Sequence, residues 1–513
     1  MKIGDTMALT IMIQGTMSNV GKSLITAGLC RVFKQDGYAV APFKSQNMAL
    51  NSFITKNGLE MGRAQVMQAE AAGIEPEVSM NPILLKPTND VGSQVIVNGE
   101  VIGTMSAKDY YKNKKKFIPD ILNAFNELEK KYDIIVIEGA GSPAEINLKK
   151  DDIVNMGMAK LVKAPVLLVG DIDRGGVFAQ LIGTVDLLED DEKDYVKGLI
   201  VNKFRGDKEI LKDGIDMLEE KAKKDVIGIV PYVNCDIDDE DSLSERFENK
   251  KTTGIINIAV IKLPKISNFT DFNVFESSEL TNLRYVKNVY ELGQPDMVII
   301  PGTKNTVSDL LWLRENGLEA EIKKLASKGK IVFGVCGGYQ ILGQKIIDFE
   351  ETDKKGEFQG IGLLPIETIF QKDKTRTRVN GIVKNISGVL SSLSGEHFEG
   401  YEIHNGNSFI TDSTAKNMNV LSEEFSGVTE EKTDGLNSEN VYGTYVHGFF
   451  DSENILEKII SSIAKQKGLD NTSIKVLNMR EYKEKQYDIL ADTIRQNIDM
   501  NKIYKILKEG IKK

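Results

Sequence analysis

The sequence predicts an α/β protein with two doubly wound domains, each built on a mostly parallel sheet. Short apolar or β-branched runs alternate with long helical or irregular segments through both halves of the chain. Two glycine-rich strings of different chemistry follow such runs, one in each half. The length of 513 residues also exceeds what a single hydrophobic core usually organises. We therefore expect two large domains.

The first half begins with a strand, a glycine-rich loop and a helix. Residues 22–35 place apolar side chains at helical spacing directly after the loop. Long connections separate the apolar runs, as expected when helices cross between parallel strands. The expected strands of this half are residues 8–13, 39–43, 134–137, 165–169, 199–202 and 226–230.

A second series of elements follows the polar stretch at residues 245–254, which we interpret as a linker. Helices fit residues 318–327 and 338–344. We expect domains at residues 1–250 and 251–452, followed by a helical C-terminal segment at 453–513 without visible chemistry. The expected strands of the second domain are residues 256–263, 297–300, 331–335, 398–403 and 441–446.

Bulk properties restrict the partners. A net charge of −10 argues against a nucleic-acid binder, because such proteins carry clustered positive charge. Three cysteines give neither a disulfide framework nor a metal-binding spacing, which fits a reducing cytoplasm. Neither a signal sequence nor a long apolar run is visible. We expect a cytoplasmic protein with small-molecule substrates and no nucleic-acid, membrane or obligate protein partner.

The string GTMSNVGKS at residues 15–23 is typical of a phosphate-binding loop. Its glycines let backbone N–H groups turn toward phosphate oxygens at the positive end of the following helix. Five residues separate Gly15 and Gly21 where the standard pattern has four, so this is a variant loop. Lys22 is expected to reach the β and γ phosphates, and Ser23 to bind Mg²⁺. The loop residues expected to bind ATP are Gly15, Thr16, Asn19, Gly21, Lys22 and Ser23.

Charged residues follow three other expected strands of the first half, where open α/β sheets bind ligands. Glu138 is a candidate second Mg²⁺ ligand, or else a helix-capping or loop acid. Lys44 is either a contact for ATP phosphate or an exposed lysine. A third group either binds metal and anionic substrate or forms a turn with internal ion pairs. This group comprises Asp171, Asp173 and Arg174.

Cys336 stands where an expected strand meets a helix, followed by two glycines. Such a corner is crowded and strained, and it leaves the thiol at a helix N-terminus whose dipole favours the thiolate. We predict that Cys336 is a nucleophile. Cys30 lies among apolar residues of an amphipathic helix and is expected in the core. Cys235 lies in an acidic loop that opposes ionisation.

A cysteine nucleophile requires a base, and the chain has three histidines. We predict that His447, at the end of an expected strand, is this base. His404 is either a wall of the site or a structural histidine. Gly302, in a turn after another strand, and Gly337 are candidates for an oxyanion hole, although a plain turn also fits.

The motifs resemble two known families. GVCGGYQILG at residues 334–343, together with His447, resembles class I glutamine amidotransferases, in which a cysteine releases ammonia from glutamine. The variant phosphate loop and IEGAG at 137–141 resemble dethiobiotin synthetase, which uses ATP to activate a carboxylate. The combination implies a glutamine-dependent amide synthetase with ATP and Mg²⁺ as cofactors.

Five further strings are distinctive. They are APFKSQNM at 41–48, MNPILLKP at 80–87, GDIDRGG at 170–176, LPKISNFTD at 263–271 and YEIH at 401–404. These strings are similar to the cobyric acid synthase family of cobalamin biosynthesis. The resemblance implies amidation of adenosylcobyrinic acid a,c-diamide at its b, d, e and g carboxylates, giving adenosylcobyric acid. Cobyrinic acid a,c-diamide synthase is the nearest alternative, and a partitioning-type nucleotide-switch ATPase is another.

One position departs from the wider amidotransferase pattern. In that pattern an acid two residues after the histidine completes a triad, and here the position holds Phe449. The motif therefore provides Cys336 and His447 but leaves open which group orients the imidazole.

Overall fold

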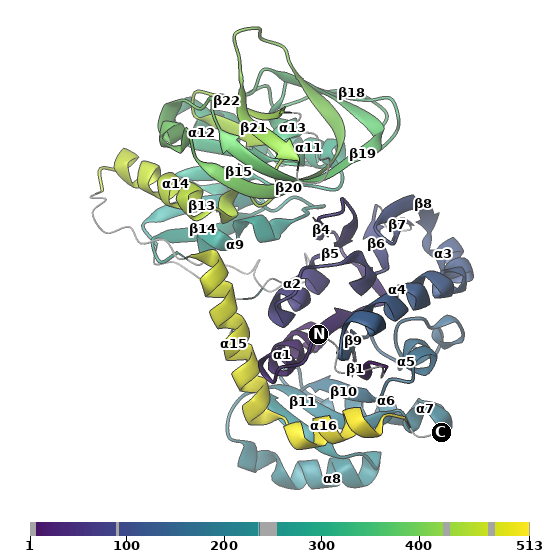
Figure 1. The fold of residues 1–513 in the computed structure, drawn as a ribbon. Coiled ribbons are helices and arrows are strands. Elements are labelled where there is room, and N and C mark those ends of the chain that lie inside the picture. Colours follow the sequence, from purple (N-terminus) through teal and green to yellow (C-terminus); the bar gives the residue numbers. More distant parts are fainter. Residues whose placement is uncertain are drawn as a thin grey trace. The chain divides into compact units, whose positions relative to one another are not determined.

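The computed structural model describes residues 7–88, 92–233, 235, 237, 254–276, 278–423, 431–469 and 478–511. The predicted linker at 245–254 lies outside the described residues, apart from Gly254. The chain folds into two compact units, neither of which is continuous in sequence (Figure 1). Unit 1 comprises Met1–Ala49, Met61–Asp238 and Lys483–Lys513, and unit 2 comprises Leu50–Glu60 and Asp239–Tyr482.

Unit 1 is built on a parallel six-stranded sheet with the strand order β12-β11-β10-β1-β9-β2. Residues on both faces of the central strands are buried, as expected of a doubly wound sheet covered by helices on each side. The six predicted strands are confirmed. Their bounds are β1 Leu9–Gly15, β2 Val40–Phe43, β9 Ile134–Glu138, β10 Val166–Asp171, β11 Val196–Phe204 and β12 Val226–Pro231.

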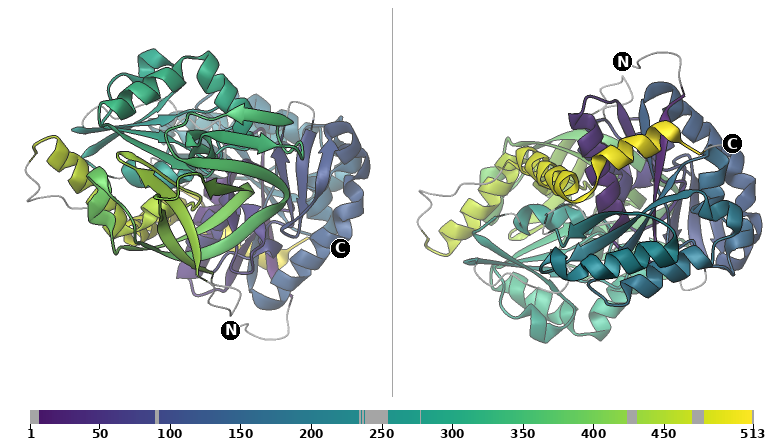
Figure 2. Two further views of the ribbon diagram at one scale, coloured as in Figure 1. Left: turned by 90° about the horizontal axis from the view of Figure 1, so that it is seen from above. Right: turned by 90° about the horizontal axis from the view of Figure 1, so that it is seen from below.

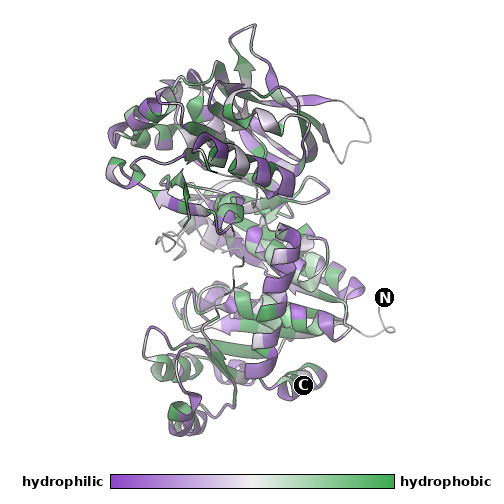
Figure 3. Cartoon of the chain, turned by 90° about the vertical axis from the view of Figure 1, so that its left-hand side faces the viewer, coloured by the Kyte–Doolittle hydropathy of each residue, from purple (hydrophilic) through white to green (hydrophobic). Residues whose placement is uncertain are grey.

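The helices of unit 1 cross between these strands, and a small second sheet has the order β3-β6-β7-β8. Both hydropathy colours appear along individual helices in Figure 3, as expected when one side of each helix faces a sheet. The helices are α1 Lys22–Gln35, α2 Arg63–Ala72, α3 Ala107–Asn113, α4 Ile118–Lys131, α5 Met156–Val162, α6 Val177–Asp186, α7 Asp190–Lys193 and α8 Lys212–Ala222. The small sheet contains β3 Gln46–Met48, β6 Ile83–Pro87, β7 Gly92–Val97 and β8 Glu100–Ser106.

The C-terminal helices complete the core of unit 1. Most of α15 (Met479–Asn497) and all of α16 (Met500–Glu509) belong to this unit, and they lie beside the N-terminal elements in Figure 2. Ile494 is fully buried against α1, where a Cβ on Gly28 would lie 2.6 Å from its Cγ1. The segment predicted at 453–513 is therefore divided, because α14 (Glu453–Gln466) packs in unit 2.

Unit 2 has a sheet whose first five strands, in the order β14-β13-β15-β16-β23, are parallel. The sheet continues through β22, β21, β19, β17 and β18, mostly antiparallel, and β20 pairs with β19. The parallel strands are β13 Ile256–Ile261, β14 Thr281–Val286, β15 Met297–Ile300, β16 Ile331–Val335 and β23 Val441–Thr444. The others are β17 Lys345–Asp348, β18 Gly356–Gln359, β19 Ile366–Val383, β20 His397–Ile410, β21 Asn417–Glu423 and β22 Lys432–Ser438.

The predicted parallel strands and both predicted helices of this unit are confirmed, whereas most of the antiparallel extension was not predicted. Its long strands β19 and β20 carry alternating and charged residues rather than the apolar runs that mark a buried parallel strand. The unit's helices are α9 Asn273–Glu276, α10 Val289–Leu292, α11 Thr306–Glu315, α12 Leu318–Ser327, α13 Gly337–Leu342 and α14.

A short hairpin contributed by the N-terminal half also belongs to unit 2. It consists of β4 (Ser52–Ile54) and β5 (Glu60–Gly62), and the part in unit 2 is Leu50–Glu60. We call Leu50–Glu60 the inserted hairpin. In the part of the chain that the structure describes, no helix is both long enough and apolar enough to cross a membrane.

Packing of the C-terminal helices is expected to stabilise unit 1 measurably. Ile494→Ala removes a fully buried side chain, so we expect the free energy of unfolding of unit 1 to fall by roughly 2–5 kcal/mol. Ile489→Ala removes the same atoms from an exposed position of the same helix. It should change the free energy of unfolding by less than about 0.5 kcal/mol. Urea unfolding of the full chain measures both, and equal effects would contradict the packing described.

Candidate functional site

In unit 1 the predicted residues gather at one edge of the sheet. Ile13 of β1 pairs with Glu138 of β9, and Gly15 pairs with Val169 of β10. The strands are parallel, so their carboxyl ends lead into loops on the same side. The strand ends and these loops carry the phosphate-loop motif, Glu138 and the string at 170–176.

The phosphate loop folds closely around Lys22. The Lys22 ammonium donates to the carbonyls of Met17, at 3.0 Å, and Gly141, at 3.2 Å. A Cβ on Gly15 would lie 2.5 Å from the Val20 side chain. Gly21 has a φ of 95°, and a Cβ there would lie 2.3 Å from Asn202. The two glycines are thus required by the close turn of the loop before α1.

A neighbouring helix and a neighbouring strand hold the remaining loop residues in place. The Thr16 hydroxyl donates to Gln180 of α6, at 3.1 Å. The Asn202 amide donates to the Val20 carbonyl at 2.7 Å, and the Lys203 ammonium donates to the Asn19 carbonyl at the same distance. Sequence reasoning missed these contacts, since Asn202 is the last residue of an ordinary expected strand and Lys203 follows it.

Glu138 is the centre of a buried polar cluster. The Ser23 hydroxyl donates to Glu138 Oε1 at 2.9 Å, and Lys44 Nζ lies 3.0 Å from the same oxygen. Gln68 of α2 donates to Oε2 at 2.5 Å. Glu138 and Lys44 are almost fully buried, which excludes the alternative of an exposed lysine. A buried carboxylate requires such partners, because an unpaired charge is strongly destabilised away from water.

This donor set fits Mg²⁺ bound beside a nucleotide. Mg²⁺ is typically held by one or two carboxylates together with substrate phosphates and water. Ser23 and Glu138 supply one hydroxyl and one carboxylate beside the loop. Among the described residues there is no group of three or more His, Cys, Asp or Glu side chains that could hold a metal by itself. The residues present suit a metal that arrives with phosphate.

The charges of the string at 170–176 are paired with one another or with β11 and the loop that follows it. Asp171 ends β10 and lies 3.0 Å from Lys203 and 3.9 Å from Arg174. Asp173 lies 2.8 Å from Arg205. The geometry therefore matches the alternative of a turn with ion pairs. Lys203 also connects Asp171 to the phosphate loop through Asn19.

In unit 2 the four parallel strands β13, β15, β16 and β23 end at a second cluster. Ile300 pairs with Gly334 and Val335 with Thr444, so the turns after β15, β16 and β23 leave the sheet together. Cys336 follows β16 with φ 52° and ψ −109°, an uncommon conformation for a residue with a side chain. Its side chain is buried, and its Sγ lies 3.6 Å from the Ile403 carbonyl.

His447 is held by a carboxylate from a distant part of the chain. Its Nδ1 lies 2.7 Å from Oδ2 of Asp271, and the Gly448 N–H donates to the other oxygen at 3.2 Å. Asp271 comes from the short η6 turn (Phe269–Phe272) after β13. The group that orients His447 is therefore Asp271, while Phe449 packs in the core beside Phe333.

The surroundings of His447 favour the imidazolium. Burial alone lowers its pKa, but the Asp271 carboxylate and the interaction with Cys336 outweigh burial and raise the pKa to about 10. The protonated form of His447 is therefore favoured. A cysteine, an imidazole and an orienting acid together can perform nucleophilic acyl transfer.

The two glycines predicted for the oxyanion hole lie at this cluster. A Cβ on Gly302 would lie 3.0 Å from His447 Cε1, and one on Gly337 would lie 3.1 Å from the Thr303 nitrogen. Asp309 binds the Thr303 hydroxyl and accepts from the Lys265 N–H at 3.2 Å. Burial raises the pKa of Asp309 to about 7, although these hydrogen bonds oppose the shift.

His404 lies on β20 beside the cysteine, with its side chain engaged in other contacts. Its Nδ1 bonds the Gly406 carbonyl at 2.9 Å, and its ring stacks on Tyr445 with centroids 3.8 Å apart. Glu402 is 3.5 Å from His404 Nε2 and 2.7 Å from Lys432. Burial opposes a charge on Glu402, but these neighbours outweigh burial and lower its pKa. This geometry fits both interpretations of His404 that the sequence left open.

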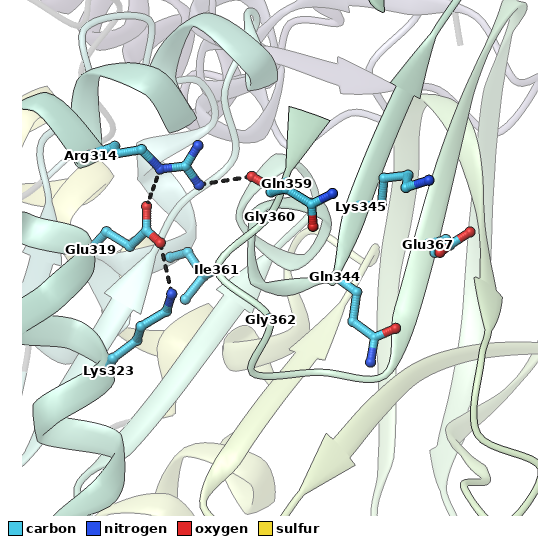
Figure 4. A pocket seen from close by; sticks show the side chains of 10 residues that line it. All are labelled: Arg314, Glu319, Lys323, Gln344, Lys345, Gln359, Gly360, Ile361, Gly362 and Glu367. Atoms are coloured by element: carbon cyan, nitrogen blue, oxygen red, sulfur yellow. Dashed lines mark hydrogen bonds and ion pairs between the residues drawn. The ribbon is translucent and has the colours of Figure 1, made fainter. Parts of the chain in front are cut away.

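Two other features lie apart from the cluster. Cys30 is fully buried, and burial raises its pKa, as expected of a core residue. A surface pocket beside α11 and α12 contains none of the predicted site residues (Figure 4). Its Glu319 accepts from Arg314 at 2.6 Å and from Lys323 at 2.8 Å, so this carboxylate is already paired with two cations.

The Asp271 contact predicts a titration. Asp271→Asn removes the largest influence that raises the pKa of His447, so the pKa should fall below about 10. Because the pKa of His447 rises from 6.5 to about 10 on folding, protonation of His447 stabilises the folded state. This contribution is fully present below about pH 6.5 and is lost as the pH rises through about 10. The stability deficit of the variant should therefore be largest near pH 6.5 and should narrow toward pH 10. Imidazole NMR of ¹⁵N-histidine protein measures the midpoint directly.

Asp412→Asn is the matched control for this titration. Asp412 is an exposed aspartate of unit 2 whose carboxylate bonds Thr414. Asp412→Asn should leave the titration midpoint of His447 unchanged. An unchanged midpoint in Asp271→Asn would contradict the pairing of Asp271 with His447.

Comparisons with known proteins cover both units. Residues 11–244 match the CobQ/CobB/MinD/ParA nucleotide binding domain, and residues 257–455 match the CobB/CobQ-like glutamine amidotransferase domain. The chain is 59% identical to the cobyric acid synthase of Ruminiclostridium cellulolyticum, over 98% of each chain. It is 56% identical to that of Lachnoclostridium phytofermentans, over 98% of this chain and all of the relative. The resemblance inferred from the motifs is confirmed, and the chain belongs to the cobyric acid synthase family.

Proposed function

We propose that this protein amidates the b, d, e and g side-chain carboxylates of adenosylcobyrinic acid a,c-diamide, using ATP and ammonia from glutamine. Membership of the family supports glutamine-dependent amidation in cobalamin biosynthesis. The observation that carries the ammonia-forming half is the arrangement of Cys336, His447 and Asp271 in the segments that follow β16, β23 and β13.

In the glutamine reaction, Cys336 Sγ attacks the side-chain amide carbon of glutamine. The thiol proton resides on His447, which returns it to the leaving nitrogen as the C–N bond breaks and ammonia departs. Asp271 holds the imidazole through Nδ1, which leaves Nε2 for this proton transfer. Water then hydrolyses the thioester, releasing glutamate and restoring the thiol.

A negative charge develops on the amide oxygen when the thiolate attacks. Backbone N–H groups stabilise such a charge well when they are already fixed in position. We assign this role to Gly337 and to the turn at Gly302, which lie beside the cysteine and His447. Asp309 keeps this turn in place through Thr303.

In the ATP reaction, a corrinoid carboxylate oxygen attacks the γ-phosphorus, and ADP leaves. The resulting acyl phosphate is attacked by ammonia, which forms the amide and releases inorganic phosphate. Gly15, Thr16, Asn19, Gly21 and Lys22 enclose the phosphates in this proposal, and Lys44 lies at the same edge. Ser23 and Glu138 would hold Mg²⁺, which neutralises phosphate charge when bound.

The string at 170–176 is proposed to assist at the nucleotide-binding edge. Asp171 is tied to the phosphate loop through Lys203, while Asp173 and Arg174 are partly exposed at the same turn. Asp173 and Arg174 are our candidates for contacting the corrinoid, and His404 is the candidate for the wall of the glutamine site.

Cys336→Ser separates the two half-reactions. Glutamine-dependent amidation should fall by roughly 10⁴-fold or more, because the nucleophile is lost. Amidation with high concentrations of ammonium salt should remain, because the phosphate loop is unchanged. Mass spectrometry of the corrinoid product measures both. Loss of both activities in a folded variant would contradict the division of labour.

Glu138→Gln tests the other half-reaction. It removes the charge that faces Lys44 and Ser23, so amidation should fall by roughly 10²-fold or more with either nitrogen source. Basal glutamine hydrolysis should continue, since Cys336 and His447 are untouched. Ammonia-dependent amidation at the normal rate would show that Glu138 has no part in the ATP reaction.

Four carboxylate-to-amide conversions per corrinoid would distinguish this function from its nearest alternative. Cobyrinic acid a,c-diamide synthase would convert two carboxylates, at the a and c positions. An intact-mass change corresponding to two conversions, with an unamidated corrinoid accepted as substrate, would overturn the proposed substrate.

A further inference from the structure

The inserted hairpin, Leu50–Glu60, lies in sequence within the nucleotide-binding half but belongs to unit 2. The neighbouring residues Ala49 and Met61 belong to unit 1. Its strands β4 and β5 are labelled in Figure 1. The hairpin thus belongs to a different unit from the residues on either side of it. No step of the reactions proposed above uses a residue of the hairpin.

The hairpin bonds two residues that support His447. The Ser52 carbonyl accepts from the Tyr401 hydroxyl at 3.1 Å and from the Asn268 amide at 3.2 Å. The Asn268 amide also donates to the Tyr401 hydroxyl at 2.9 Å. All three residues are buried, so these hydrogen bonds form without competition from water.

Tyr401 and Asn268 each lead directly to the His447–Asp271 pair. The Tyr401 ring stacks on His447 with centroids 5.3 Å apart, and the two residues exchange backbone hydrogen bonds at 2.9 and 3.1 Å. Asn268 begins the η6 turn, and its carbonyl accepts from the Asp271 N–H at 3.1 Å. One backbone carbonyl of the hairpin therefore contacts both supports of the imidazole.

The hairpin is itself firmly attached to unit 2. Phe53 packs edge-on against Tyr401 with centroids 5.2 Å apart, and Ile54 is fully buried with Tyr401 and Ile403. At the far end, Glu60 forms a 2.8 Å ion pair with Lys374 of β19, and both side chains are largely buried. A buried ion pair broken by removal of one partner is costly, which favours a fixed hairpin.

We propose that the inserted hairpin is a positioning element of the glutamine-hydrolysing site, acting through Tyr401 and Asn268 on His447 and Asp271. This inference rests on the proposed role of Cys336 and His447 in glutamine hydrolysis. Phe53 and Ser52 touch none of the reacting atoms, and they act by fixing the imidazole. Displacement of about 1 Å at a catalytic group can cost roughly 10²-fold in rate, so small losses of support should be visible in kcat.

Phe53→Ala tests the inference in the full-length enzyme. The kcat for glutamine hydrolysis should fall by roughly 10–100-fold, because the Tyr401 ring loses its edge-on partner. KM for glutamine should change by less than about twofold. Phe53→Tyr retains the ring and should restore most of kcat. Amidation with ammonium salt should equal that of the unmodified enzyme in both variants.

Asn57→Ala is the matched control, since Asn57 is an exposed residue at the tip of the same hairpin. It should leave kcat unchanged. If Phe53→Ala does not fold, Tyr401→Phe decides the question, because it keeps the ring on His447 but removes the hydroxyl that bonds the hairpin. It should lower kcat for glutamine hydrolysis without raising KM.

The outcomes separate this inference from the proposed function. Glutamine hydrolysis that survives Cys336→Ser would overturn the proposed function itself. If Cys336→Ser is inactive, the proposed function stands and the hairpin can be judged separately. A normal kcat for glutamine hydrolysis in folded Phe53→Ala would then overturn the positioning role. If Phe53→Ala does not fold, a normal kcat in Tyr401→Phe would overturn it instead. A rise in KM with unchanged kcat would assign the hairpin to glutamine binding and would also contradict the inference.

Discussion

The hydrogen bond between buried Asp271 and His447 is the interaction on which the chemistry proposed for unit 2 depends. Without the acid, burial would disfavour the imidazolium, and the ring would have no fixed orientation toward Cys336. With it, one ring nitrogen is occupied and the other is available for proton transfer. The turns around it, carrying Gly302, Gly337 and Asn268, support this geometry.

Both units place their polar clusters by the same structural rule. In each, neighbouring parallel strands end on the same side, and the strand ends and the loops after them carry the side chains of the proposed sites. Unit 1 uses this arrangement to surround a buried glutamate with a serine, a lysine and a glutamine. Unit 2 uses it to assemble a cysteine, a histidine and an aspartate. The inserted hairpin and the C-terminal helices also make each unit depend on sequence from outside its main segment.

Much of this architecture could be predicted from the sequence, because buried parallel strands are continuous apolar runs and α1 and α12 have clear helical spacing. Cys336 and Glu138 were recognisable because each ends such a run. Asp271 was not assigned, although it closes the quoted string at 263–271, because 176 residues separate it from His447. Local spacing cannot show a contact of that range. Similarly, the helical spacing predicted a helical segment at 453–513 but not that Gly28 and Ile494 meet. The alternating strand β19 had too weak an apolar signal, and only residues 398–403 of β20 were predicted as a strand.

Nitrogen tracing tests the central claim most directly. The enzyme is incubated with ATP, Mg²⁺, adenosylcobyrinic acid a,c-diamide and glutamine labelled with ¹⁵N in its side-chain amide, and the corrinoid is analysed by mass spectrometry. The account predicts a product with four new amides, each carrying ¹⁵N even when a modest amount of unlabelled ammonium is present. A product whose new amides carry nitrogen from the ammonium pool, or a corrinoid that gains none, would contradict it.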